Sequence, residues 1–151
     1  MKKAIITLSI PPDRPISKIA FLNHQGFADY CEAEHIVISV RKFYTHLPVE
    51  FEKIQVFEIG LGFDVSIYVD EDTLFFPKAI DFFIKYPTGR GQFYASIYPD
   101  TMVNKIISKQ FNKVRKKIKH VLKKKDILFF NAGQWITDKT CCSKILVASK
   151  A

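Results

Sequence analysis

Apolar residues along the chain form two patterns, short β-rich runs and segments with a three- or four-residue repeat. The short runs predict strands, which we expect at residues 4–10, 35–40, 64–69, 92–98 and 127–130. The repeating segments predict helices, which we expect at residues 16–34, 51–61, 79–85, 103–122 and 140–150. Because strands alternate with helices almost throughout, the pattern predicts an α/β domain with an open, mostly parallel sheet flanked by helices.

Length and composition fit one globular domain over residues 1–151, with 48% hydrophobic and 25% charged residues. The apolar runs are far shorter than the about 20 residues that cross a bilayer. The first run ends at Pro11, so we interpret it as a strand rather than a secretory signal. The three cysteines, Cys31, Cys141 and Cys142, form no Cys-x-x-Cys pair. They favour a reducing, cytoplasmic setting over a disulfide scaffold or zinc site.

The net charge of +8 comes from one segment. Residues 113–125 hold eight of the 23 Lys and Arg residues and no acid, so the rest of the chain has 15 of each sign. This segment overlaps the predicted helix at 103–122, and the plain interpretation is a packed helix with a solvated basic face. A second interpretation is peripheral contact with anionic lipid, where each Lys or Arg contributes about 1 kcal/mol. Nucleic-acid binding is a third, but aromatic residues are not interleaved with the segment.

Three acidic residues, Asp70, Glu71 and Asp72, directly follow the predicted strand at 64–69. Ligands of open α/β sheets bind at the carboxyl ends of strands. In an extended chain Asp70 and Asp72 point to one side and Glu71 to the other. Two converging carboxylates require a cation, and oxygen ligands suit Mg²⁺ or Mn²⁺, which bridge diphosphate oxygens. This Asp-x-Asp motif therefore predicts a metal–diphosphate site, with a solvated turn as the alternative.

Five segments between residue 4 and about residue 139 resemble, in order, the nucleotide-sugar-binding half of GT-A-fold (Rossmann-like) glycosyltransferases. The resemblance includes galactosyltransferases, mannosyltransferases and family 8 enzymes. The most specific segment is 64–74, DVSIYVDEDTL, which is similar to the family's D-x-V-x-Y-x-D-A-D-T-L. The other segments are the first strand with Thr7 near its end, the helix at 23–30, the stretch 48–55 with its Lys-Ile pair, and Phe-Asn-Ala-Gly within 129–133.

The resemblance implies roles for individual residues. Asp72 would ligate the divalent metal, Mn²⁺ or Mg²⁺, and Asp70 would contact the metal or the ribose. The loop after the first strand would surround the nucleotide through Thr7, Ser9 and Arg14. The donor sugar would lie against Asn131, Ala132 and Gly133, where glycine permits close backbone approach. The alternative for these three residues is an ordinary strand-to-turn junction.

The implied function is metal-dependent transfer of a hexosyl group from a nucleoside diphosphate sugar to a glycan or lipid-linked acceptor. Relatives continue past the Asn-Ala-Gly strand to a metal-binding histidine, whereas here no histidine follows Gly133 and Asp138 is the only later acid. We therefore expect a minimal or truncated enzyme, or a site completed by another chain. The alternative is a non-catalytic module that binds a nucleotide sugar or an anionic surface. Either would be cytoplasmic, with peripheral contact to the inner face of the membrane through 113–125.

Several other residues carry weaker signals. Lys53 is equally consistent with a solvated position and with a phosphate or acid partner. Trp135 fits a core position better than a sugar-stacking platform. The four histidines have no metal-binding spacing, and we expect them to be structural or exposed: His24, His35, His46 and His120.

Overall fold

The computed structural model describes residues 1–11, 14–43, 45–86, 89, 91–97 and 130–149. The elements in chain order are β1 (Lys3–Leu8), α1 (Pro15–Tyr30), β2 (Glu34–Ile38), the 3₁₀ helix η1 (Val49–Lys53), α2 (Ile54–Gly60), β3 (Val65–Asp70), α3 (Phe82–Lys85), β4 (Phe93–Ile97), β5 (Phe130–Asp138) and α6 (Lys139–Ser149). The chain divides into two compact units, Met1–Tyr94 with Gly133–Ala151, and Ala95–Ala132.

The strands form one five-stranded sheet in the order β2-β1-β3-β5-β4. Strand β1 pairs in parallel with β2 and β3, whereas β3 pairs with β5 in antiparallel. The α/β class is therefore confirmed, and the expectation of a mostly parallel sheet is corrected to a mixed sheet. The apolar pattern of a buried strand is the same in both chain directions. It therefore does not show whether the strand runs parallel or antiparallel to its neighbours in the sheet.

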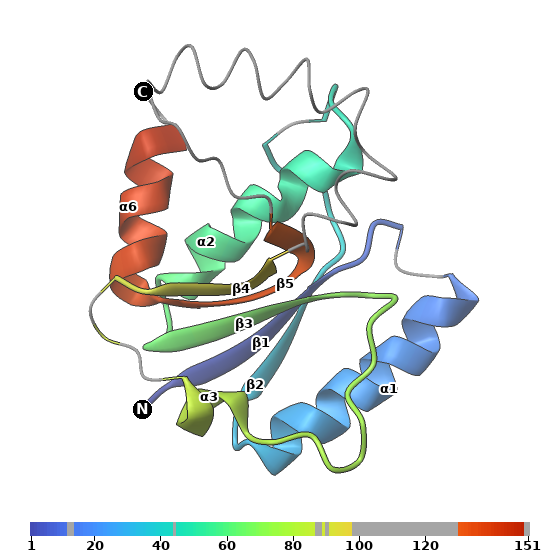
Figure 1. The fold of residues 1–151 in the computed structure, drawn as a ribbon. Coiled ribbons are helices and arrows are strands. Elements are labelled where there is room, and N and C mark those ends of the chain that lie inside the picture. Colours follow the sequence, from blue (N-terminus) through green and yellow to red (C-terminus); the bar gives the residue numbers. More distant parts are fainter. Residues whose placement is uncertain (12–13, 44, 87–88, 90, 98–129, 150–151) are drawn as a thin grey trace. The chain divides into compact units, whose positions relative to one another are not determined.

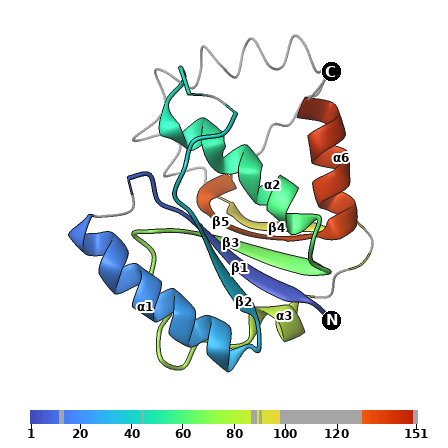
Figure 2. The same ribbon diagram turned by 180° about the vertical axis from the view of Figure 1, so that it is seen from behind.

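Helices cover both faces of this sheet. Figures 1 and 2 show α1 and α3 on one face and α2 and α6 on the other. Strand β1 buries every residue from Ala4 to Leu8, and β3 every residue from Val65 to Val69. Such continuous burial is expected of central strands that helices cover on both sides.

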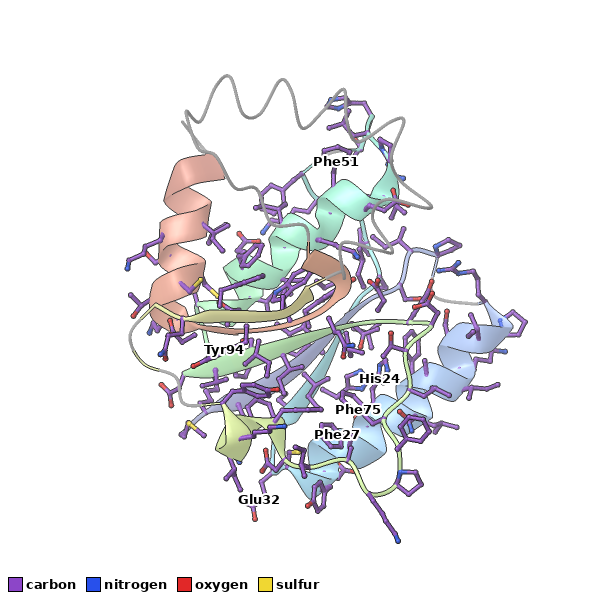
Figure 3. All side chains as sticks on the ribbon, viewed as in Figure 1. His24, Phe27, Glu32, Phe51, Phe75 and Tyr94 are labelled. Atoms are coloured by element: carbon purple, nitrogen blue, oxygen red, sulfur yellow. The ribbon has the colours of Figure 1, made fainter. Side chains whose placement is uncertain are left out.

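The core on the α1 side centres on Phe27, whose ring stacks on that of Phe75 with 3.9 Å between centroids. Figure 3 shows these two residues and His24 as neighbours beside α1. Phe75 lies in the segment that follows β3, and Asn23 of α1 bonds both its backbone N–H (2.7 Å) and its C=O (2.9 Å). This segment is therefore fastened to α1 directly after the tip of β3.

The core on the opposite face is built around Trp135, which stacks on Tyr68 at 4.2 Å and on Phe57 at 5.7 Å between ring centroids. The expected core position of Trp135 is confirmed. Helices α2 and α6 pack together here, and a Cβ on Gly60 would lie 2.6 Å from Cys142 Sγ. Glycine is thus required at this crossing for the two helices to approach so closely.

The three cysteines are free and buried. Burial raises the pKa of Cys31 to about 12 and that of Cys142 to about 11. Both thiols are therefore protonated at neutral pH and act as small apolar groups.

Several element boundaries differ from the sequence prediction. The helix expected at 51–61 is η1 followed by α2, and the one expected at 79–85 is only α3. The first helix ends at Tyr30, because Glu32 adopts a left-handed φ of 53° before β2 begins. Strand β5 runs from Phe130 to Asp138, so 131–133 lie within a strand and not at a strand-to-turn junction.

The predicted helix at 103–122, the basic segment 113–125 and strand residues 127–129 lie outside the described residues. Predictions about lipid or nucleic acid that depend on this segment stay predictions. Within the ranges that the structure describes, no helix combines the length and the apolar character needed to cross a membrane. The final helix, expected at 140–150, is confirmed as α6.

Candidate functional site

A pocket with a volume of about 210 Å³ opens at the carboxyl ends of β1 and β3. The two strands are in register, with Leu8 paired to Asp70, so they end at the same edge of the sheet. An apolar wall that includes Leu8 and Ile16 faces the charged residues of the pocket. Among the described residues, two cationic and four anionic side chains also line the pocket: Arg14, Lys53, Glu50, Asp70, Glu71 and Asp72.

The Asp70 carboxylate has two partners. Lys53 Nζ lies 2.9 Å from Oδ1 and 3.2 Å from Oδ2, and the Tyr68 hydroxyl donates to Oδ1. Burial, followed by the neighbouring Asp70 charge, raises the pKa of Tyr68, so its hydroxyl stays protonated and able to donate. Lys53 Nζ also lies 5.1 Å from the centroid of the Tyr68 ring. The acid-partner interpretation of Lys53 is confirmed.

A buried glutamate holds Lys53 in place. Glu52, next to Lys53 in η1, is fully buried. Its Oε2 accepts from the backbone N–H groups of Lys42 (3.0 Å) and Phe43 (3.1 Å) and from Gln55 Nε2 (2.8 Å). These bonds tie η1 to the segment after β2, which fixes the point from which the Lys53 side chain reaches Asp70.

Glu71 is a buried residue of the pocket that sequence reasoning missed. Its Oε2 accepts hydrogen bonds from Ser9 Oγ (2.5 Å) and Ser17 Oγ (2.6 Å), and its Oε1 pairs with Arg14. The signal in the sequence was the set of hydroxyl and guanidinium donors in the loop after the first strand. Ser9 and Arg14, predicted to contact a nucleotide, both bind Glu71, but only Arg14 lines the pocket. Ser9 is buried behind it and is not a lining residue.

The expected alternation of the acidic side chains is wrong. The chain turns directly after Asp70, and the Thr73 N–H bonds the Asp70 carbonyl at 3.1 Å. Because alternation holds only for extended backbone, Glu71 is not turned away, and it lines the same pocket as its two neighbours. Asp72 is exposed, and its carboxylate has no hydrogen bond or ion pair to any residue that the structure describes.

Asp70 and Asp72 remain the candidate metal ligands. Among the described residues, no group of three or more His, Cys, Asp or Glu side chains is arranged to hold a metal ion. Mg²⁺ commonly takes only one or two carboxylates and completes its shell with phosphate oxygens and water. The Asp70 and Asp72 carboxylates fit a cation of that kind, whose coordination shell an anionic ligand would complete. They do not fit a cation that protein ligands alone surround.

Thr7 does not line the pocket, contrary to its predicted role. It is buried, with Oγ1 2.9 Å from His24 Nδ1 and 3.2 Å from His35 Nε2. Along β1, Thr7 shares a face with Ile5, which packs on Phe27 of α1. Leu8, on the other face, lines the pocket instead.

The two histidines around Thr7 are neutral. His24 Nε2 donates to the Thr73 carbonyl at 2.6 Å, so Nδ1 accepts from the Thr7 hydroxyl, which in turn accepts from His35. Burial lowers the pKa of His24, and burial together with the nearby His24 lowers that of His35 to about 4. His24 and His35 are therefore structural, as expected, and tie β1, β2 and α1 to the turn after β3.

The predicted sugar-binding residues Asn131, Ala132 and Gly133 lie in β5. The antiparallel register pairs Gln134 with Val69, so Gly133 adjoins the Asp70 end of β3. Gly133 is half-buried and is not among the lining residues of the pocket. The side chains of Asn131 and Ala132 lie outside the described part of the structure.

No protein-family model, curated protein or solved structure matches this chain. The resemblance to GT-A glycosyltransferases stays a prediction from the five sequence segments. Function must therefore be inferred from the pocket itself, above all from Asp70 paired with Lys53, Glu71 paired with Arg14, and the exposed Asp72.

Proposed function

We propose that the chain binds a nucleoside diphosphate sugar in this pocket and transfers its hexosyl group to a glycan or lipid-linked acceptor with the help of Mn²⁺ or Mg²⁺. The observation that carries the proposal is the acidic turn at the tip of β3, which lines one pocket together with Arg14 and Lys53. The proposal also assigns the sheet to the GT-A fold. The order of the five sequence segments and the position of the pocket at the strand ends support that assignment.

The charges in the pocket suit a diphosphate bound together with a metal ion. The described residues contribute four carboxylates and two cations to the pocket, and these charges together repel an anionic ligand that binds alone. Asp72 and Glu50 are both exposed carboxylates of the pocket, and Asp72, beside Asp70 at the tip of β3, is the one that we assign to the divalent cation together with Asp70. The metal would offset the negative charge that develops on the diphosphate leaving group. The Arg14 side chain is about half exposed, at 52%, and its guanidinium provides a second positive group for the phosphates.

The buried residues behind the pocket organise the ligand-facing ones. Glu71 draws Ser9 and Ser17 together, which fixes the loop between β1 and α1 beside the strand tip. Arg14 is held at the pocket by the same carboxylate. Charged groups oriented in advance cost little reorganisation when a ligand binds.

Titration calorimetry with UDP and GDP sugars, with and without Mn²⁺, tests the proposal. We expect Mn²⁺-dependent binding of at least one nucleotide sugar, and its loss in Asp72→Asn. The matched control is Asp29→Asn, which changes the same charge on an exposed residue of α1 outside the pocket. Absence of metal-dependent heat for every nucleotide sugar, or equal binding by the two variants, would contradict it.

A second candidate is a module that binds the nucleotide sugar without transferring it. It is favoured by the ion pair with Lys53 that occupies Asp70 and by the absence of any three-ligand metal group in the described ranges. Incubation with a radiolabelled nucleotide sugar and Mn²⁺ separates the two. An enzyme transfers or slowly hydrolyses the sugar, whereas a binding module leaves it intact at saturating occupancy.

A further inference from the structure

Lys53 occupies the carboxylate that the proposed metal would need. Its Nζ lies 2.9 Å and 3.2 Å from the two oxygens of Asp70. We propose that Lys53 is an exchangeable counter-ion, which neutralises Asp70 in the absence of ligand and transfers to the ligand's diphosphate when a divalent cation binds. This inference rests on the proposed function and adds that the metal and the diphosphate each strengthen the binding of the other.

The geometry allows Asp70 to keep its orientation after the exchange. The Tyr68 hydroxyl donates to Oδ1, whereas Oδ2 has Lys53 as its one hydrogen-bond partner in the described part of the chain. Tyr68 is fully buried and stacked on Trp135, so its hydroxyl does not move with Lys53. One oxygen of the carboxylate therefore stays anchored while the other becomes available.

Lys53 is suited to such a transfer. The ammonium is a point charge on a flexible stem, and the side chain starts from the end of η1, at the wall of the pocket. The Tyr68 ring beside Nζ offers a further favourable contact that does not depend on the carboxylate. The buried anchor at Glu52 holds the backbone, so only the side chain needs to change position.

Because of this exchange, the affinity of the pocket for the metal and its affinity for the anion depend on each other. A cation that binds alone must displace Lys53 and leave its ammonium next to a second positive charge, which is unfavourable. A diphosphate compensates the displaced ammonium and also completes the metal shell. Each ligand therefore raises the affinity of the other, by the same factor in both directions.

The variant Lys53→Met tests the inference through binding of Mn²⁺ alone, followed by the electron paramagnetic resonance signal of free Mn²⁺. We expect Lys53→Met to bind Mn²⁺ about tenfold more tightly than the unmodified protein, because Asp70 is no longer neutralised. UDP should then raise the Mn²⁺ affinity of Lys53→Met less than that of the unmodified protein. The control is Lys42→Met, which removes the same charge from the exposed pair with Glu58 outside the pocket. Mn²⁺ binding by Lys53→Met that is no tighter than by Lys42→Met would overturn the inference.

A second measurement tests the inference while Lys53 keeps its positive charge. Reductive ¹³C-methylation keeps lysines cationic, and the Lys53 signal is assigned by its absence from Lys53→Arg. We expect this signal to shift when Mg²⁺ and UDP are added together, and a signal that stays in place would overturn the inference.

If Lys53→Met binds Mn²⁺ tightly but no nucleotide sugar binds, the proposed function fails and the competition for Asp70 stands. If nucleotide sugars bind but Lys53→Met does not tighten Mn²⁺ binding, the exchange fails and the proposed function stands.

Discussion

The Ser17 hydroxyl donates a hydrogen bond of 2.6 Å to the Glu71 carboxylate and so connects the first turn of α1 to the tip of β3. The same oxygen accepts from Ser9, and Arg14 pairs with the other oxygen. A charge buried in this way is stable only while its partners remain in place. The candidate site is therefore supported by a fixed network that lies directly behind it.

Removal of the Glu71 carboxylate should destabilise the fold. In Glu71→Ala the two serine hydroxyls lose a buried acceptor, and we expect the free energy of unfolding to fall by about 2–4 kcal/mol. Urea denaturation at pH 7.5 measures the change. Glu58→Ala removes an exposed carboxylate paired with Lys42 and should cost at most about 1 kcal/mol. Equal effects of the two substitutions would refute a structural role for Glu71.

Stability should decrease as the pH falls from about 6.5 toward 4. The pKa of His35 lies near its ordinary value of about 6.5 in the unfolded chain but at about 4 in the folded protein. The unfolded state therefore takes up a proton first, and the stability present above pH 6.5 is lost through this window. We expect His35→Gln to reduce the loss between pH 7.5 and 4.5 by about 2 kcal/mol, measured by urea denaturation. His46→Gln, at an exposed position, should leave the pH dependence unchanged, and the same slope in both variants would count against this explanation.

Asp138 should be essential for the backbone conformation of the segment before β4. Its Oδ2 accepts from the backbone N–H groups of Gly89, Gly91 and Gln92, and its Oδ1 from that of Cys141, at 2.8–3.0 Å. Burial opposes ionisation of Asp138, but these four bonds outweigh it and lower its pKa. We expect Asp138→Ala to lower the free energy of unfolding by about 3 kcal/mol in thermal or urea denaturation. Amide exchange should accelerate at Gly91 and Gln92, and unchanged protection there would contradict the assignment.

The crossing of α2 and α6 should not tolerate a side chain at Gly60. A methyl group would lie 2.6 Å from Cys142 Sγ, so we expect Gly60→Ala to cost about 1–3 kcal/mol. The double variant Gly60→Ala with Cys142→Ala should recover part of this loss, because the smaller residue makes room. Gly26→Ala is the control, since a Cβ there meets nothing within 4 Å. Because alanine favours a helix interior over glycine, we expect the calorimetric melting temperature to rise or stay unchanged in Gly26→Ala. A melting temperature of Gly60→Ala that does not fall below that of the unmodified protein would contradict the packing explanation.

Strands β1 to β4 and the helices α1, α2 and α6 could be predicted from sequence, because burial imposes periodicity on the chain. The strand expected at 127–130 shares only Phe130 with β5. The antiparallel direction of β5 could not be predicted, because its pattern of apolar residues is the same in both chain directions. The position of Asp70 was predicted because it directly follows a buried run. Its side chain faces α2 for the same reason that Tyr68, two residues earlier, stacks on Trp135.

Strand alternation accounts for the differences at Glu71 and Thr7. It ends at Asp70, where the chain turns, so it does not predict the direction of the Glu71 side chain. Within β1 it places Thr7 on the same face as Ile5, toward α1 and away from the pocket. Partners distant in sequence, such as Lys53 for Asp70 and Ser17 for Glu71, follow from tertiary packing that no local pattern encodes.

The central claim is that the acidic turn after β3 receives a divalent cation together with a nucleoside diphosphate. A crystal structure of the chain soaked with UDP and Mn²⁺ tests it most directly. We expect Mn²⁺ bound to Asp70, to Asp72 and to the diphosphate, with Lys53 Nζ moved from Asp70 to a phosphate oxygen. A nucleotide bound at a different place, or crystals whose pocket takes up neither UDP nor Mn²⁺ at saturating concentration, would contradict it.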